Sequence, residues 1–337
     1  MWILWLEFIL CAGAIVFSGT MLSRYGDVIA EKAGMGRTWV GLALMASVTS
    51  LPELINGISS VTIADVPNIA IGDVMGSCIF NISLIALLDI FCGPGPIFSS
   101  ADDGHTISAG FGIILIGIAS ISIFAGQNIP SFGGIGLYTP IIILIYLTGI
   151  RSVFLFEKRR IAEFVGEKAE EMRYEHIGVR KAVVIYSINA AVIVVAAAFL
   201  PFIGDRLAES TGLGGSFVGT FFIGMTTSLP ELVVSLAALR IGAADMAIAN
   251  LFGSNMFNVF LIAVDDIFYA KGPVLSHVSM THSVTGVIAV VMTAIAVVSL
   301  TYRLRRKTFL RIGWDAAAIL LAYFVSILLL YSMRRMG

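Results

Sequence analysis

The hexapeptide Thr-Ser-Leu-Pro-Glu-Leu occurs twice in this 337-residue chain, at Thr49–Leu54 and at Thr227–Leu232. Each copy lies inside a long apolar segment, and the copies are 178 positions apart. Each one places a proline, which has no N–H for the carbonyl one turn back, directly before a glutamate. The spacing predicts an internal duplication, and each copy predicts a break in a helix.

The composition around the two copies is that of a membrane protein. Hydrophobic residues make up 58% of the chain and charged residues 13%, and the mean hydropathy is +0.95. The formal net charge of −1 leaves no basic domain to neutralise phosphates, which argues against a nucleic-acid partner. Cys11, Cys78 and Cys92 show no paired spacing, so we expect free thiols.

The hydropathy pattern predicts an all-α membrane protein with ten transmembrane helices of about 20 residues each. They cover approximately residues 2–22, 35–60, 68–91, 106–125, 131–150, 181–201, 213–239, 245–269, 279–300 and 312–332. A polar connection at residues 151–180, expected to be a solvated and partly helical loop, divides the spans five and five. The predicted domains are therefore a first five-helix repeat (1–150), the loop (151–180) and a second repeat (181–337).

The distribution of basic residues predicts the orientation. With the N-terminus outside, the inner loops hold 17 of the 21 Lys and Arg residues, as the positive-inside rule requires. We therefore expect a multi-pass protein of the plasma membrane, in contact with the lipid bilayer, with both termini outside and the 151–180 loop cytoplasmic. Because each half has an odd number of spans, the second repeat is inverted relative to the first.

The repeated glutamates Glu53 and Glu231 are ionisable groups at membrane depth, where such groups are usually functional. Carbonyls freed by a proline are tolerated there only inside protein or beside a cavity. Hydroxyls, freed carbonyls and carboxylates together are hard oxygen ligands that suit Na⁺ or Ca²⁺. A proline kink with a neutral buried glutamate is the alternative for one copy, but two matched copies favour a cation site.

A second repeated segment follows each hexapeptide: GDVMGSCIFNISL aligns with ANLFGSNMFNVFL at an offset of 177. A hydroxyl and an amide one helical turn apart face the same way in each copy: Ser77 with Asn81, and Ser254 with Asn258. Gly76 and Gly253 precede these pairs and would allow helices to approach closely. Ordinary interhelical packing is the alternative, and the symmetric recurrence favours ligands.

These two motifs resemble the α-repeats of the sodium/calcium exchangers within the calcium/cation antiporter superfamily. The resemblance covers both halves of the chain. It implies a secondary active antiporter that exchanges Na⁺ for Ca²⁺ by alternating access, with no enzyme activity and no cofactor besides the transported ions. A monomer would be sufficient for transport.

The resemblance also implies a set of ligands near the membrane midplane, between the second, third, seventh and eighth spans. Glu53 and Glu231 would be shared acidic ligands, with Thr49 and Thr227 completing the Ca²⁺ site. Na⁺ would be served by Ser50, Ser228, Ser77 and Ser254, together with the carbonyls of Ala46 and Gly224. Asn81 and Asn258 would line the middle of the site.

Three features depart from the family pattern. Val48 and Thr226 stand where the family usually has glycine. Asn258 stands where the potassium-dependent branch carries an acid, which predicts that K⁺ is not required. Asp89 and Asp266 lie at matching repeat positions, and our hypothesis is that they form cation-attracting vestibules, with Asp73 and Asp265 adding to the outer one. The alternative is that these acids simply reach water at the membrane interface.

Two other transport mechanisms fit the same residues. A Ca²⁺/H⁺ exchanger could use the two glutamates, because buried carboxyls can trade protons for a metal. A channel enclosed by the two repeats is less favoured, because channels more often gain selectivity from rings of subunits. An intramembrane enzyme is disfavoured, because all four histidines lie in or near predicted connections.

Overall fold

Long apolar helices dominate the computed structural model. It describes the chain except for residues 1, 94, 100, 165–173, 175, 211–226, 304–306, 309–311 and 335–337. Within that part, seven helices are long and apolar enough to cross a membrane, and the broken pair on either side of Ser50 makes an eighth span. The predicted all-α membrane architecture is confirmed, whereas the count of ten spans stays a prediction.

The described residues form two compact units, and each unit combines segments from both halves of the sequence. Unit 1 contains Met1–Pro52 and Ile150–Gly253, and unit 2 contains Glu53–Gly149 and Ser254–Gly337. Three helices have residues in both units: α4 (Leu51–Thr62), α7 (Tyr138–Phe164) and α11 (Ala244–Phe268).

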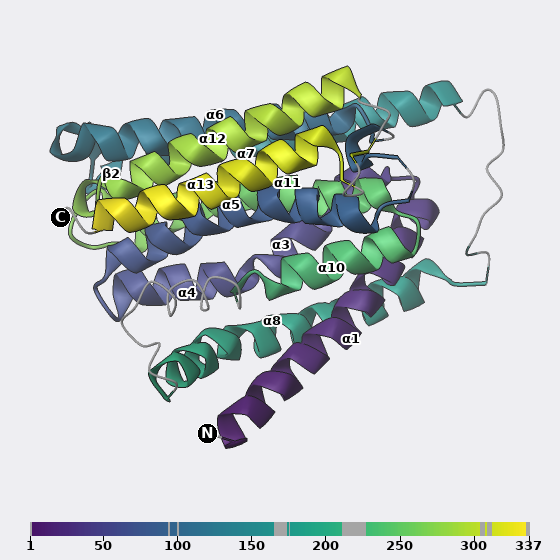
Figure 1. Ribbon diagram of the computed structural model, residues 1–337, viewed down its shortest axis with the longest axis horizontal. Coiled ribbons are helices and arrows are strands. Elements are labelled where there is room, and N and C mark those ends of the chain that lie inside the picture. The colour runs from purple at the N-terminus through teal and green to yellow at the C-terminus, as the bar shows by residue number, and fades with distance from the viewer. Residues whose placement is uncertain are drawn as a thin grey trace. The chain divides into compact units, whose positions relative to one another are not determined.

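Unit 1 is organised around the contact between α1 and α8, which run side by side (Figure 1). Ile15 is fully buried there against Ala196 and Ala197. At the start of α1, Trp2 and Ile3 are 89% and 72% exposed, as apolar side chains that face lipid would be. The other elements of unit 1 are α2, η1, α3 and α10. Their bounds, with those of α1 and α8, are Trp2–Ala33 (α1), Arg37–Trp39 (α2), Val40–Met45 (η1), Ala46–Thr49 (α3), Val179–Ser210 (α8) and Leu229–Arg240 (α10).

Helix α1 continues eleven residues beyond the predicted span, to Ala33. The sequence turns polar here, but one face of the extension stays buried. Ser23 Oγ donates to the Val234 carbonyl at 2.8 Å. The buried Asp27 accepts from Arg37 Nε at 2.6 Å and from the Tyr174 hydroxyl at 3.0 Å. The helix therefore persists because its polar groups have partners, a condition that hydropathy does not measure.

Unit 2 is built on α5 and α11, whose apolar stretches are 72% and 83% buried, against 28% for α7. Helix α12 packs on α6, α5 and α13, and α13 also packs on α5. Strands β1 and β2 pair antiparallel, with Ser131 opposite Gly136. The bounds are Pro67–Phe91 (α5), Ile97–Ser99 (η2), Gly104–Ala125 (α6), Gly126–Asn128 (η3), Ser131–Phe132 (β1), Ile135–Gly136 (β2), Val274–His277 (η4), Thr281–Tyr302 (α12) and Trp314–Arg334 (α13).

Two glycines allow a close contact between helices in unit 1. A Cβ at Gly41 would lie 2.5 Å from the Met246 carbonyl oxygen, and one at Gly253 would lie 2.5 Å from the Leu42 carbonyl oxygen. Both positions bring the π-helical turn η1 against α11, and π-helical turns are frequent at functional sites. The predicted close approach therefore exists at Gly253. No described atom lies within 4 Å of a Cβ at Gly76.

Gly253 and Gly76 occupy matching repeat positions, so they give a paired test of this contact. We expect Gly253→Ala to lower the thermal unfolding midpoint in detergent, because forcing a methyl group into packed backbone costs about 1–3 kcal/mol. Gly76→Ala should leave the midpoint unchanged or raise it, since alanine is favoured over glycine inside a helix by roughly 0.5–1 kcal/mol. Equal midpoints for the two variants would contradict the assignment.

Candidate cation site

The first copy of the hexapeptide breaks a helix, and the second copy has the same backbone geometry at its serine. Ser50, between α3 and α4, has φ −95° and ψ 9°. Ser228, which precedes α10, has φ −88° and ψ 11°. Pro52 and Pro230 then fall in the first turn of the following helix, where a missing N–H costs little. The predicted break is confirmed at the first copy, and the agreement of the two serines' backbone angles at positions 178 apart supports the duplication.

The two copies of the hexapeptide meet in unit 1. Ser50, from the first copy, donates from Oγ to Glu231 Oε1 of the second copy at 3.1 Å. Both side chains are fully buried. A hydroxyl and a carboxylate from segments 181 residues apart in the sequence thus converge in a place from which water is largely excluded. This is the chemistry that a dehydrated cation needs.

The backbone at the first break adds a further oxygen. Thr49 Oγ1 donates to the Ala46 carbonyl at 3.2 Å, and the Ser50 N–H points to the same oxygen at 3.1 Å. Val48 lies in the helical part of α3, so its Cβ causes no strain there. Thr227 and Ser228 are buried at the second break. Gly224 and Thr226 lie outside the described residues.

The remaining predicted ligands lie in unit 2. They are buried there, with exposed fractions of 4% or less: Glu53, Ser77, Asn81, Ser254 and Asn258. Asn81 Nδ2 donates to Asn255 Oδ1 at 3.1 Å. The Asn255 amide in turn donates to the Cys78 carbonyl at 3.0 Å. The two copies of the second motif are therefore also in contact, through α5 and α11.

Two asparagines of α11 differ in a way that the sequence did not reveal. Asn255 joins the two motifs, yet its matching position in the first repeat is Cys78, so a search for recurring residues passes over it. Neither amide atom of the fully buried Asn258 has a hydrogen-bond partner among the described residues. A buried amide without a partner costs about 1–3 kcal/mol per group, so this side chain suits a ligand role better than a packing role.

The donor set favours hard cations. Within the described ranges, no group of three His, Cys, Asp or Glu side chains is placed to hold a metal ion. The buried groups at the two motifs are hydroxyls, amides and two carboxylates. Oxygen donors of this kind suit Na⁺ and Ca²⁺ and bind soft metals poorly.

Asp89 has a structural role and does not attract ions from solution. Its Oδ1 accepts from the Ile97 N–H at 2.5 Å and its Oδ2 from the Gly313 N–H at 2.6 Å. The side chain is fully buried and lies 3.8 Å from the Lys307 ammonium. It therefore fastens the loop that follows α5 and the start of α13.

Asp266, at the matching position of the second repeat, has the same structural role. Its carboxylate accepts from the Val274 N–H at 2.7 Å and the Gly136 N–H at 2.8 Å. The hydroxyls of Tyr138 and Thr139 also donate to it. Val274 and Gly313 each lie 177 positions after their counterparts for the other aspartate, Ile97 and Gly136. The vestibule hypothesis is wrong for Asp89 and Asp266, because both are buried and each accepts hydrogen bonds from two backbone N–H groups, with two hydroxyls added at Asp266 and the Lys307 ammonium near Asp89.

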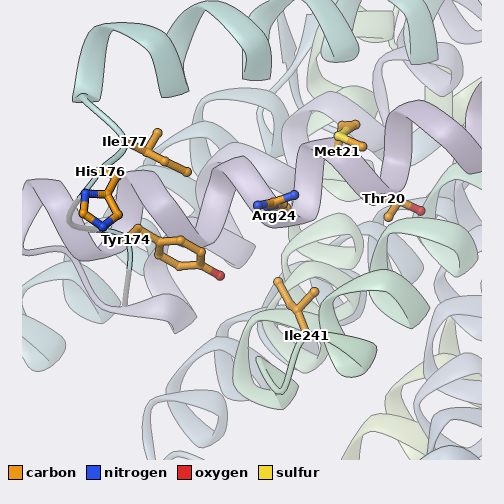
Figure 2. A pocket seen from close by; sticks show the side chains of 7 residues that line it. All are labelled: Thr20, Met21, Arg24, Tyr174, His176, Ile177 and Ile241. Carbon is orange, nitrogen blue, oxygen red and sulfur yellow. The ribbon is translucent and has the colours of Figure 1, made fainter. Parts of the chain in front are cut away.

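A surface cavity of about 640 Å³ in unit 1 lies away from both motifs. Figure 2 shows Thr20, Met21 and Arg24 of α1 on one side of it and Tyr174 on the other. Its described lining is completed by His176, Ile177 and Ile241. These residues include no carboxylate, and Arg24 brings a positive charge, so the cavity does not suit a cation.

Comparisons with known proteins give a consistent result. A family model described as sodium/calcium exchanger protein matches residues 3–150 and 181–333. Sodium/calcium exchanger MaX1 of Methanosarcina acetivorans is 26% identical, over 91% of this chain and 93% of its own length. Inner membrane protein YrbG of Escherichia coli is 25% identical over 74% of each chain. A solved structure of the sodium-calcium exchanger NCX_Mj matches in fold, with a TM-score of 0.73, 21% identity and coverage of 97% and 99%.

The apolar helices, the twin breaks and the buried oxygen donors define a multi-pass membrane protein that exchanges cations. The family match spans both repeats and omits only the central loop and the ends. The chain belongs to the sodium/calcium exchanger family, and the resemblance inferred from the two motifs is confirmed.

The structural role of Asp89 and Asp266 can be tested by substitution. We expect Asp89→Asn and Asp266→Asn each to lower the thermal unfolding midpoint, because hydrogen bonds to a charged group are worth about 1.5–3 kcal/mol each. Asp65→Asn is the control, since its exposed ion pair with Lys271 contributes at most about 1 kcal/mol. Unchanged midpoints, combined with weaker cation uptake at low salt, would restore the vestibule hypothesis.

Proposed function

We propose that this protein exchanges Na⁺ for Ca²⁺ across the plasma membrane by alternating access, without a requirement for K⁺. The observation that carries the proposal is the hydrogen bond between Ser50 and Glu231, since it joins a hydroxyl of one hexapeptide to a carboxylate of the other. The family membership supports it, as do the names of the relative MaX1 and of NCX_Mj, both sodium/calcium exchangers.

The ligand roles follow the chemistry of each group. Glu53 and Glu231 supply two negative charges, which balance one Ca²⁺, with the hydroxyls of Thr49 and Thr227 beside them. Serine hydroxyls and carbonyl oxygens suit Na⁺, and these are Ser50, Ser77, Ser228, Ser254, Ala46 and Gly224. The amides of Asn81 and Asn258 line the middle. Holding both carboxylates charged without any cation would cost several kcal/mol. Ca²⁺ should therefore leave only as Na⁺ enters, and Na⁺ only as Ca²⁺ enters.

Alternation needs a moving element, and we assign it to α1 and α8. These are the first helices of the two halves, and their contact is made by apolar side chains at Ile15, Ala196 and Ala197. Apolar side chains at this contact can slide past one another, whereas the hydrogen bonds from α1 to Val234 and Tyr174 must break or their partners must move with the helix. Na⁺ and Ca²⁺ would bind the inward-open and outward-open states with different affinities, and this difference would drive the exchange.

A Ca²⁺/H⁺ exchanger remains the alternative, because the two glutamates could carry protons. The number of buried hydroxyls and amides favours Na⁺, since a proton needs no coordination shell. The two mechanisms differ in the gradient that drives uptake.

The first test measures ⁴⁵Ca²⁺ uptake into proteoliposomes loaded with Na⁺. We expect uptake to require internal Na⁺ and to fall by about a hundredfold or more in Glu53→Gln and in Glu231→Gln, since a charged partner in a buried site is worth about 3–5 kcal/mol. Glu7→Gln is the matched control, because Glu7 lies in the apolar helix α1 outside both motifs. Its uptake should match that of the native protein.

An imposed pH gradient separates the two mechanisms in the same vesicles. Uptake that follows the pH gradient and ignores Na⁺ would overturn sodium coupling and leave the glutamates as ligands. Loss of uptake in Glu7→Gln equal to that in the motif variants would show that the substitutions act through folding.

A second test addresses K⁺. We expect native uptake to be the same when K⁺ is replaced by choline, because Asn258 adds no negative charge for a further cation. Asn258→Asp adds a carboxylate at a buried position and should make uptake respond to K⁺. The measurement is the initial rate of Na⁺-dependent ⁴⁵Ca²⁺ uptake against K⁺ concentration, and a native protein that needs K⁺ would refute this part of the proposal.

A further inference from the structure

Asp265 and Asp266 are neighbours in α11, yet their surroundings are opposite. Asp266 accepts four hydrogen bonds from backbone and hydroxyl donors. Asp265 is fully buried, and neither of its carboxylate oxygens has a hydrogen-bond partner within the described part of the chain. A buried carboxylate is costly unless a cation balances it or a proton neutralises it. Asp265 therefore needs a cation or a proton to balance its charge.

The Asp265 carboxylate is directed at α4. A Cβ at Gly57 would lie 2.6 Å from its Oδ1 and 2.8 Å from its Oδ2, so only glycine leaves room for the two oxygens. Gly57 comes four residues after Glu53, so the two positions share a face of α4 about 6 Å apart along its axis. Asp265 therefore reaches α4 one turn away from a proposed ligand of the transported ions.

A second acid, Asp73 on α5, reaches the same turn of α4. Gly57, which faces the Asp265 carboxylate, directly follows Asn56 in α4. Asn56 Nδ2 donates to Asp73 Oδ2 at 2.7 Å, which orients this carboxylate from the α4 side. Three neighbouring helices thus contribute oxygen-bearing side chains to one place: Asn56 from α4, Asp73 from α5 and Asp265 from α11.

The matching positions, one in the first repeat and two in the second, carry no such charge. Leu88 corresponds to Asp265, Asn250 to Asp73 and Ser235 to Gly57. The Asn250 amide donates to Ser235 Oγ at 3.0 Å, which makes a neutral packing contact. The repeated architecture therefore folds without acids at these positions. The acid pair joins Asp73 of the first repeat to Asp265 of the second, near the membrane face that the basic-residue distribution predicts to be outside.

A surface cavity opens beside this end of α11. The cavity, of about 670 Å³, is lined in part by Tyr269, Asp65, Asn68 and Lys271. Tyr269 is one turn beyond Asp265, and its N–H donates to the Asp265 carbonyl at 2.9 Å. The cavity therefore brings solvent to about one helical turn from Asp265 along α11, and the positive charge of Lys271 is paired there with Asp65.

We propose that Asp265, Asp73 and Asn56 form a second Na⁺ site in unit 2, at which Na⁺ waits before or after it occupies the ligands around Glu53. The role of this site in transport rests on the proposed sodium/calcium exchange. The binding of Na⁺ at the site does not depend on that proposal. A monovalent ion fits, because Ca²⁺ takes six to eight oxygens and the described residues hold no group of three acidic or other metal-ligating side chains.

The test measures the thermal unfolding midpoint in detergent at pH 7.5, with NaCl or with choline chloride at equal ionic strength. It uses the Glu53→Gln/Glu231→Gln double variant, in which the two acidic ligands of the transport site are neutral. We expect NaCl to raise the midpoint of this protein by about 2–4 °C or more, because a ligand that binds only the folded state stabilises it. Adding Asp265→Asn should abolish this rise and leave the choline midpoint unchanged or higher, since an unbalanced buried charge is removed.

Three further variants test the interpretation. Asp73→Asn in the same background should reduce the Na⁺ rise, which keeps the test valid if Asp265→Asn folds poorly. Asp266→Asn, one residue along α11, should lower the midpoint in both salts and keep the Na⁺ rise. Asp103→Asn removes an exposed ion pair with Arg303 and lies outside the cavity lining, so it should change the midpoint little and keep the rise.

The outcomes separate this inference from the proposed function. A Na⁺ rise that survives both Asp265→Asn and Asp73→Asn overturns the site, as does a rise that choline reproduces. A rise that depends on Asp265, in a protein that moves no Ca²⁺ in vesicles, supports the site while the proposed exchange fails. Ca²⁺ that stabilises the double variant through Asp265 more strongly than Na⁺ overturns the monovalent assignment.

Discussion

A carboxylate buried at membrane depth must be balanced, and this constraint organises the rest of the structure. Proline supplies the means, because it ends one helix and lets the next begin with a glutamate in its first turn. Ser50, at the first break, then reaches the glutamate of the other copy. Neither a continuous helix nor a single copy of the motif would bring these groups together.

The duplication is visible in individual hydrogen bonds as well as in sequence. Asp89 and Asp266 bind backbone N–H groups that are themselves 177 positions apart, and the two break serines share their backbone angles. These repeated contacts hold the loops at the ends of the helices. Departures from the pattern are then informative, because the fold does not require them. Asp73, which matches Asn250, and Asp265, which matches Leu88, are such departures.

The sequence predicted the helices, the breaks and the family well, because hydropathy, proline and a repeated motif each report on one local property. It predicted less about residues whose role depends on tertiary partners. Asp89 and Asp266 looked like exposed acids because the backbone donors that engage them lie up to 224 positions away in sequence. Asn255 was missed because its repeat counterpart is a cysteine. The extension of α1 was missed because Asp27 finds its partners in Arg37 and Tyr174.

The bond between Tyr174 and α1 has a practical consequence. Tyr174 belongs to the central loop, and it binds α1 twice, through its hydroxyl to Asp27 and through its N–H to Glu31. A displacement of α1 must therefore carry this part of the loop with it or break both contacts. A spectroscopic label in the loop would report the position of a membrane helix from the aqueous side, without any probe placed in the bilayer.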